Sequence, residues 1–544
     1  MAPTMASSFI VPSSKEEVLS TYNFAVIHLR QQYRFRRLGI TLGAGVSVPL
    51  SYPSWEGLVS RISEHSIFPR NLFGALPEAS LSSNTQRIFE FFRKCIPRNT
   101  DETDRLYDER VANYWKRILS ECLYHDNTGS SKEDNIASHP YLSSLLPIIE
   151  QANITVNFNF DDSIEHALDL RNSRALPPRK GRCYEIRWDL AAPIRNDLPT
   201  IFHPNGFIPH REHEYSSDNV VFAEDSFLKR MTLGKIGDDS VWINEYINST
   251  YIHVGVSLKD EILKALLQRS WRGAPANVHF QIHYTASATL DIDVKDSIVD
   301  ANFRVLNLFT MFLGNEGSKS LFDLITMDDK EFHDLAKRNG CELKYVFYVT
   351  GAVGAGKTTV VNHFRNLWAM DEWLEPSPPL ISRSYDRLND DEKKEADSWV
   401  GNQFYLKNRK ILESRESIII VDRCPLDPIT FEISNPASRA KLLASQISPG
   451  KSNYNLQSGV IFNLEAEPYE LRVRLIRKWK FWSEDIIKRL STDIKSLYGD
   501  MTINLDTKGL TLEEVVRSVA KIVFLDEYRP ARLHEKLESI ADLR

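Results

Sequence analysis

A buried strand, a glycine-rich turn and the start of a helix follow one another directly in the second half of the chain. The strand is Tyr345–Thr350, and the turn reads Gly351-Ala-Val-Gly-Ala-Gly356-Lys357-Thr358-Thr359, which matches the pattern G-x-x-x-x-G-K-[ST]. Small residues let backbone N–H groups wrap a polyphosphate, while the lysine reaches the outer phosphates and the hydroxyl can ligate magnesium. The pattern predicts an α/β fold that binds ATP or another nucleoside triphosphate with Mg²⁺.

The turn should open an amphipathic helix, because Val360, Val361, Phe364, Leu367 and Trp368 recur at helical spacing. The residues that we expect to contact the phosphates are Gly351, Gly354, Gly356, Lys357, Thr358 and Thr359. Thr358 is also the first candidate magnesium ligand.

The composition is that of an ordinary globular protein: 544 residues, 42% hydrophobic, 26% charged and a formal net charge of -6. This balance indicates no overall basic surface for nucleic acid. The five cysteines are isolated and odd in number, which argues against a disulfide framework and a cysteine zinc site. No apolar run approaches the length of a membrane span. We therefore expect a cytoplasmic protein that contacts no membrane. As partners we expect small nucleotides and further copies of the chain in a homo-oligomer.

Short apolar strands alternate with helical patterns in two blocks, which predicts parallel strands with crossover helices in two tandem α/β domains. We expect an N-terminal tail over 1–20, a first domain over 21–290, a helical connector over 291–342 and the phosphate-loop domain over 343–544. The expected strands are 38–42, 154–158, 200–202, 220–222 and 251–255, then 345–350, 417–421, 459–464 and 501–505.

The strand Ser417–Val421 ends in Asp422, followed by Arg423. A carboxylate at this end of a strand can hold magnesium beside the phosphates, although an aspartate can also simply cap a turn. The Asp422-Arg423 pair resembles thymidylate kinases and deoxynucleoside kinases, in which it contacts magnesium, base or transferred phosphate. The resemblance implies that both residues bind the nucleotide and that Asp422 ligates the metal.

Basic residues recur over Glu467–Lys480, namely Arg472, Arg474, Arg477, Lys478 and Lys480. The segment resembles the lid of the same kinases, in which arginines close over the phosphates. Arginine suits this role because its planar fork grips phosphate oxygens. The same spacing also fits the solvated face of a helix.

In the first half, the strand Leu38–Leu42 runs into Gly43-Ala44-Gly45-Val46-Ser47, a loop of small residues that could approach a pyrophosphate or form a tight turn. Pro53-Ser-Trp55 follows. Together the two stretches resemble the sirtuin-like NAD-binding family. Tyr251–Asp260 resembles that family's G-x-S-x-x-D strand end. The resemblance implies that NAD contacts Gly43, Ala44, Gly45, Ser47, Trp55, Gly255, Ser257 and Asp260.

The segment Asn157-Phe-Asn159-Phe-Asp161 resembles the family's T-x-N-[YF]-D motif. It implies a catalytic asparagine at Asn159 with Asp161 as its companion, while a shifted register would use Asn157. The family's four-cysteine zinc module is absent from the sequence, so the chain resembles the zinc-free branch that hydrolyses NAD, often in antiviral defence.

A second departure concerns the family's catalytic histidine, which lies in an H-G dipeptide. The matching stretch is Phe202-His203-Pro-Asn205-Gly206, with Asn205 at the histidine position. Asparagine can hydrogen-bond a ribose hydroxyl but cannot take its proton. His203 lies two residues earlier and could substitute, or it could be a structural histidine at a strand end.

The leading hypothesis is a sirtuin-like NAD hydrolase, producing nicotinamide and ADP-ribose, that is governed by a kinase-like nucleotide domain in an antiviral effector. The alternative is a nucleoside or nucleotide kinase whose sirtuin-like half is an inert regulator. A third possibility makes both halves binding modules in an oligomeric scaffold.

Overall fold

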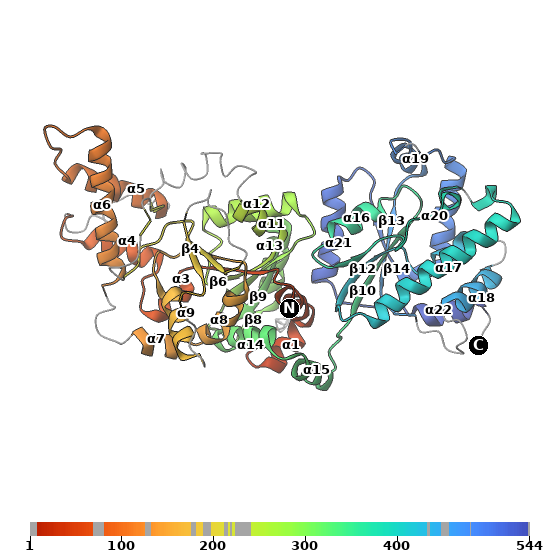
Figure 1. The fold of residues 1–544 in the computed structure, drawn as a ribbon, viewed down its shortest axis with the longest axis horizontal. Coiled ribbons are helices and arrows are strands. Elements are labelled where there is room, and N and C mark those ends of the chain that lie inside the picture. Colours follow the sequence, from red (N-terminus) through yellow and green to blue (C-terminus); the bar gives the residue numbers. More distant parts are fainter. Residues whose placement is uncertain are drawn as a thin grey trace, which may run out of the picture. The chain divides into compact units, whose positions relative to one another are not determined.

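The computed structural model describes residues 8–68, 81–125, 132–175, 181–188, 197–210, 216–217, 220–222, 241–383, 385–431, 436–447, 456–478 and 480–541. The chain forms two compact units (Figure 1). The first comprises Met1–Gly273 and Asn277–Asn339, and the second comprises Ala274–Ala276 and Gly340–Arg544.

The N-terminal unit is built on a parallel sheet in the order β4-β5-β3-β2-β6-β7-β9. The strands are β2 (Leu38–Leu42), β3 (Ile154–Asn157), β4 (Glu185–Arg187), β5 (Thr200–Phe202), β6 (Thr250–Val254), β7 (His279–Tyr284) and β9 (Leu308–Leu313). Every residue of β2, β3 and β6 is buried, as expected for middle strands of a parallel sheet that is covered on both faces.

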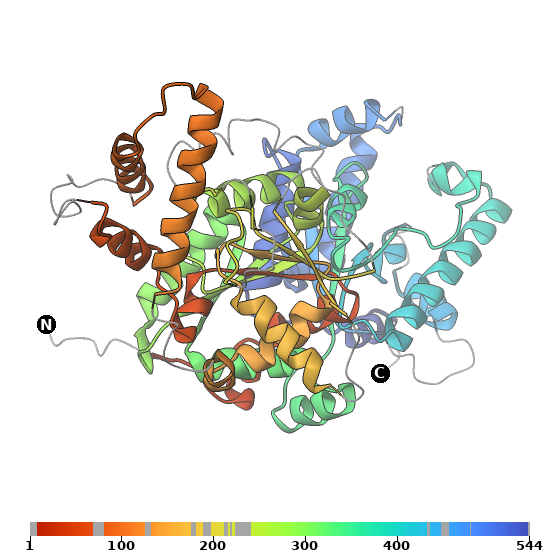
Figure 2. The ribbon, with the colours of Figure 1, turned by 60° about the vertical axis from the view of Figure 1, so that its left-hand side comes forward.

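Helices cover both faces of this sheet (Figure 1). One layer contains α1 (Lys15–Thr21), α2 (Asn23–Arg34), α8 (Leu142–Gln151) and α14 (Asn315–Thr326), and the other contains α11 (Val241–Asn248), α12 (Glu261–Gly273) and α13 (Ile292–Leu306). The remaining helices are α3 (Ala44–Ser47), α4 (Trp55–Glu64), α5 (Leu81–Cys95), α6 (Asp104–Leu123), α7 (Lys132–Ser138), α9 (Ser163–Arg174) and α15 (Asp329–Arg338). Helices α5 and α6 (orange) stand away from the sheet (Figure 2).

The strand order places a topological switch point at β2, which pairs with β3 on one side and with β6 on the other. The loops that follow β2, β3, β5 and β6 therefore meet at one edge of the sheet, where ligands bind in open α/β sheets. The parallel register brings Leu42 beside both Asn157 and Val254.

Two predicted boundaries of this unit are wrong. The expected helical connector over 291–342 contains β9, whose six residues pair with β7 as the last strand of the sheet. The run Leu308-Phe-Thr-Met-Phe-Leu313 is apolar because it is buried, and it lacks the alternation that marks a half-exposed strand. The expected tail over 1–20 contains α1 and β1 (Ser8–Ile10), which pairs antiparallel with β8 (Thr289–Asp291).

The strand expected at 220–222 is also wrong, because these residues have no regular secondary structure. Val221 donates its N–H to Asn205 O across 2.7 Å, so the segment is held by one loop instead of a strand ladder. Residues 223–225, which follow this expected strand, lie outside the described residues.

The C-terminal unit is built on a five-stranded parallel sheet in the order β11-β12-β10-β13-β14. The strands are β10 (Tyr345–Gly351), β11 (Trp368–Met370), β12 (Ile418–Asp422), β13 (Val460–Glu465) and β14 (Thr502–Asp506). The helices are α16 (Lys357–His363), α17 (Asp390–Glu413), α18 (Pro436–Ile447), α19 (Pro468–Ile476), α20 (Glu484–Tyr498), α21 (Leu512–Leu525) and α22 (Leu533–Ala541).

Helix α16 is shorter than the apolar spacing predicts, since it ends at His363 and the predicted helical residue Trp368 begins β11. Phe364 and Leu367 are buried in the turn between them. The short connection brings the segment after β11 to the same sheet edge as the glycine-rich turn. No helix within the described ranges has the length and apolarity of a membrane span.

Candidate nucleotide sites

The glycine-rich turn of the C-terminal unit lies between β10 and α16, as the sequence predicts. Gly354 and Gly356 have φ angles of 83° and 96°, in the left-handed region that favours glycine. A Cβ atom on Gly356 would meet nothing within 4 Å, so this glycine is required by backbone conformation alone. The turn leaves the first backbone N–H groups of α16 without helical partners, as at any helix start.

Lys357 lies buried against this turn. Its Nζ donates to Gly351 O across 2.8 Å and to Ala352 O across 3.1 Å. Burial, together with the nearby Arg423 charge, lowers the pKa of Lys357 to about 8. The ammonium is therefore held inside the loop by two carbonyls, which a phosphate could replace as partners.

Asp422 lies at the carboxyl end of β12 and is completely buried. Neither carboxylate oxygen has a hydrogen-bond partner among the described residues. Burial raises the pKa of Asp422, and the charge of Lys357 and the nearby Thr358 hydroxyl counter part of the rise. A buried, unpaired carboxylate beside a threonine hydroxyl is a donor set that suits Mg²⁺, so the residues fit the predicted metal.

Arg423 forms an ion pair with Glu372. The sequence predicts Arg423 as a site residue, but it does not single out Glu372. Arg423 Nε donates to Glu372 Oε1 across 2.7 Å. Burial alone would raise the pKa of Glu372, but the charges of Arg423 and Lys357 outweigh it and lower the pKa to about 2. Glu372 lies two residues after the end of β11. The apolar spacing predicts a longer α16 in place of β11, so no strand end is expected near Glu372.

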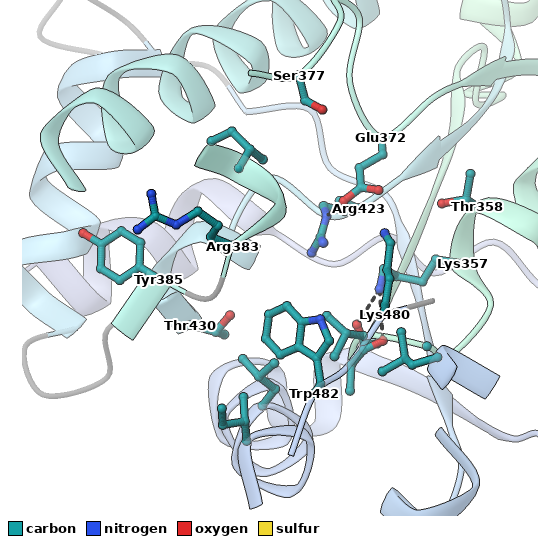
Figure 3. A pocket seen from close by; sticks show the side chains of 18 of the residues that line it. Lys357, Thr358, Glu372, Ser377, Arg383, Tyr385, Arg423, Thr430, Lys480 and Trp482 are labelled. Atoms are coloured by element: carbon teal, nitrogen blue, oxygen red, sulfur yellow. Dashed lines mark hydrogen bonds and ion pairs between the residues drawn. The ribbon is translucent and has the colours of Figure 1, made fainter. Parts of the chain in front are cut away.

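Two cavities adjoin the glycine-rich turn. The first, of about 330 Å³, is lined by Lys357, Thr358, Glu372 and Arg423, and it continues toward Tyr385. Figure 3 shows Glu372 beside Arg423, with Lys357 and Thr358 to one side and Arg383 and Tyr385 to the other. The second, of about 310 Å³, is lined by Gly354, Gly356, Thr359, Arg474, Thr507 and Leu510.

The far part of the first cavity is built from aromatic and charged groups. Tyr385 Oη donates to Asp397 Oδ2 across 2.9 Å, and Arg439 Nη1 donates to the same oxygen across 2.6 Å. Trp373 and Trp482 line the same cavity. Such a compartment can hold a flat polar molecule against aromatic walls.

Only some of the basic residues of the predicted lid segment lie at the first cavity. Arg474 does not point toward the first cavity, because it donates to Thr507 Oγ1, Thr507 O and Glu470 Oε1. It therefore ties α19 to the loop after β14. Lys478 and Lys480, from the segment after α19, do line the first cavity. Arg477 lines the second, and Arg472 lies 4.0 Å from Glu484.

In the N-terminal unit, the loop after β2 packs directly on the end of β6. A Cβ atom on Gly43 would lie 2.6 Å from Gly255 O, and one on Gly45 would lie 2.7 Å from Gly255 Cα. The N–H groups of Gly43, Gly45 and Val46 already donate to backbone carbonyls within this contact. Close approach of the two loops thus explains these glycines without a ligand, and pyrophosphate binding by this loop stays a prediction.

The structure brings Asn159 to that loop. Its Nδ2 donates to Gly43 O and to Ser47 Oγ, each across 3.0 Å. Asn157 instead lies within β3, and its Oδ1 accepts from Asn159 N. Of the two registers, only that of Asn159 places the amide against the glycine loop. Burial raises the pKa of the Asp161 carboxyl, which accepts from Ser163 N.

His203 and Asn205 are both completely buried. His203 Nδ1 lies 2.9 Å from Asn159 O, and Nε2 lies 2.9 Å from Glu165 Oε1. Both ring nitrogens are therefore engaged, Nδ1 by a backbone carbonyl and Nε2 by a carboxylate. Asn205 Nδ2 donates to Phe158 O across 3.0 Å. His203 therefore holds the Asn159 backbone in place and presents no nitrogen to a ribose in this conformation.

The other predicted NAD contacts have local structural roles. Trp55 stacks on Phe222 with ring centroids 5.0 Å apart. Ser257 Oγ accepts from Lys259 N, and Asp260 Oδ1 caps α12 by accepting from Leu263 N. Ala44 opens α3 beside the Asn159 amide. These residues follow strands of the one parallel sheet, and their contact with NAD stays a prediction.

Comparisons with known proteins address the two units separately. Residues 153–305 match the SIR2-like domain family, so the chain contains a SIR2-like domain. A search of curated proteins gave no match.

Two solved structures are similar to part of the chain. A deoxyadenosine kinase from M. mycoides with dCMP and a flexible dCDP bound is 15% identical, covers 32% of this chain and 96% of its own, and gives a TM-score of 0.26. A thymidylate kinase from Candida albicans is 14% identical, covers 34% of this chain and 97% of its own, and gives a TM-score of 0.25.

Replacing Asp422 by Asn should separate metal binding from nucleotide binding. An amide keeps the size of the side chain but lacks the negative charge that a magnesium shell favours. We expect Asp422→Asn to bind a nucleoside triphosphate with a weakened dependence on magnesium in calorimetric titrations. A magnesium dependence equal to that of the unchanged chain would assign Asp422 to the turn alone.

The ligand-free protein should become more stable between pH 8 and pH 9.5. Burial lowers the pKa of both Lys357 and Lys407 to about 8, so these groups lose their protons in the folded chain before they do in the unfolded chain. The unfolded state then binds more protons, and stability rises with pH by about 1 to 3 kcal/mol.

Scanning calorimetry of the full chain measures this rise in the transition that a nucleoside triphosphate shifts. Lys407→Met removes one of the two titrating groups and should show about half the gain. A transition that weakens steadily from pH 8 would contradict the expected direction.

Proposed function

We propose that the C-terminal unit transfers the terminal phosphate of a magnesium nucleoside triphosphate to a small acceptor, as nucleoside and nucleotide kinases do. The observation that carries this proposal is the pair of cavities beside one glycine-rich turn. A hydrolase or a simple nucleotide sensor needs room for one nucleotide. Here the first cavity continues past Glu372 and Arg423 and gives space for a phosphate acceptor, while the second cavity gives space for the rest of the nucleoside triphosphate.

Each residue around the turn has a role in this reaction. Lys357 would pair with the outer phosphates, and Thr358 with Asp422 would hold Mg²⁺, which neutralises the charge of the phosphates when bound. Glu372 is ionised at neutral pH and lies between the turn and the far compartment. It would accept the hydrogen bond of the acceptor hydroxyl, while Arg423 fixes its direction and supplies positive charge beside the transferred group.

The test uses a terminally labelled triphosphate with a panel of nucleosides and nucleoside monophosphates. We expect label in a nucleoside phosphate, and Glu372→Gln should lower this transfer by about 100-fold or more because an amide cannot take a proton. The matched control is Asp371→Asn, one residue earlier, whose carboxylate is exposed and pairs with Arg365. Label that appears only in inorganic phosphate would contradict the transferase proposal.

A second candidate activity is NAD cleavage by the SIR2-like domain. In this case the chain would be an antiviral effector whose NAD cleavage is controlled by its nucleotide-binding unit. It is favoured by the Asn159 amide, which lies against Gly43 and Ser47 at the switch point of the sheet. In this conformation both ring nitrogens of His203 are engaged and Asn205 offers an amide, so neither of these two positions supplies a base for the reaction.

NAD cleavage is tested by nicotinamide release with and without nucleoside triphosphates. If the domain is active, Asn159→Ala should lower release by about 100-fold, the usual scale for a positioned polar catalytic group. Asn205→His should raise release, because it restores the residue that the resemblance implies. Absence of nicotinamide from the parent chain and from Asn205→His under every condition would remove NAD cleavage as a function.

A further inference from the structure

Helix α17 carries a buried polar face toward the C-terminal site. Gln403 and Lys407 lie one helical turn apart, and they are 0% and 2% exposed. A lysine ammonium is costly to bury, so a position that needed only packing would be filled better by an apolar side chain. The contacts of this face therefore call for a specific explanation.

Lys407 contacts the backbone of Asp422 and Glu372, the two acidic residues that the proposed transfer reaction uses. Its Nζ donates to Asp422 O across 2.5 Å and to Glu372 O across 3.3 Å. These residues lie at the ends of β12 and β11, two neighbouring strands. One ammonium thus bridges the segment that holds the predicted metal ligand and the segment that holds the predicted acceptor contact.

The Asp422 carbonyl belongs to a turn in an uncommon backbone conformation. Arg423, the next residue, has a φ angle of 75°, in a region that a residue with a side chain seldom enters. This conformation brings its guanidinium to Glu372 Oε1. Because Lys407 binds the carbonyl of the peptide that enters the turn and also the carbonyl of Glu372, it fixes both segments that carry the Arg423–Glu372 ion pair.

Gln403 extends the same support along the chain. Its Oε1 accepts from Leu374 N across 2.9 Å and from Glu375 N across 3.3 Å, and its Nε2 donates to Glu375 Oε2 across 2.7 Å. The segment after Glu372 has no strand to hold it, so these bonds fix its path.

We propose that Lys407, assisted by Gln403, is a positioning residue of the phosphoryl-transfer site, which sets the distance and direction between Glu372 and Asp422 by binding their backbone carbonyls. The inference rests on the proposed function of the C-terminal unit. It assigns to α17 a part in catalysis that requires no contact with either substrate.

The experiment compares Lys407→Met and Gln403→Met with Lys410→Met, an exposed lysine on the same helix. A residue that only orients other catalytic groups should affect kcat and leave the KM of the nucleoside triphosphate nearly unchanged. We expect kcat to fall by about 10- to 100-fold in Lys407→Met, the scale typical of outer-shell partners, with a smaller fall in Gln403→Met. Lys410→Met should match the unchanged chain.

A second readout separates this inference from the transfer activity. If Lys407 positions Asp422, then Lys407→Met should weaken the magnesium dependence of triphosphate binding, measured by titration, whether or not an acceptor is phosphorylated. A chain that transfers no phosphate overturns the proposed function, and the titration still decides the role of Lys407.

Three outcomes overturn the positioning role. These are an unchanged kcat in both variants, a rise in KM without a fall in kcat, and an unaltered magnesium dependence. Should Lys407→Met fail to fold, judged by its melting transition, Gln403→Met decides through the same split between kcat and KM.

Discussion

The ion pair between Arg423 and Glu372 is the contact on which the C-terminal site depends. It joins the segments that follow two neighbouring strands at a partly buried position, where an unpaired charge would be costly. The left-handed backbone conformation of Arg423 adds a separate free-energy cost, which the ion pair helps to offset. Lys407 and Gln403 hold the two segments from one side, and Lys357 contributes a further charge from the glycine-rich turn.

The two units use the same sheet geometry in different ways. In both, loops at the carboxyl ends of parallel strands meet at a switch point. In the C-terminal unit, neither carboxylate oxygen of Asp422 has a hydrogen-bond partner in the part of the chain that the structure describes, and a cavity lies beside the loop. In the N-terminal unit, the loop after β2 is bonded to the end of β6, and Asn159, His203 and Asn205 bond to one another's segments. The two units therefore differ at their first loops: a cavity lies beside the glycine-rich turn of the C-terminal unit, whereas the N–H groups of Gly43, Gly45 and Val46 already bond to backbone carbonyls.

The sequence predicts best those features that depend on local order. The strand, turn and helix around Lys357, the acid at the end of β12 and the strand before Gly43 are contiguous patterns, and the structure places them as expected. The pairing of Glu372 with Arg423 joins residues 51 positions apart, and nothing local marks Glu372 as a partner. The sequence pattern predicts Lys407 to be a solvent-exposed charge on a polar helix, because many of its neighbours are charged.

Some predictions failed because one pattern fits two structures. The apolar residues from Val360 to Trp368 have helical spacing, yet a helix and a short strand divide them. Leu308–Leu313 lacks alternation because both of its faces are covered, so it was not predicted as a strand. Whether His203 is structural or catalytic depends on its contact with the Glu165 carboxylate, which forms only when the chain folds.

The central claim is that the two cavities beside the glycine-rich turn hold the donor and the acceptor of one reaction. Calorimetric titration with two nucleosides joined by a polyphosphate chain tests this most directly, because such a ligand fills both cavities at once. The account predicts one ligand per chain, bound more tightly than the nucleoside triphosphate alone and in competition with it and with the acceptor. A joined ligand that binds no more tightly than the triphosphate would contradict the claim.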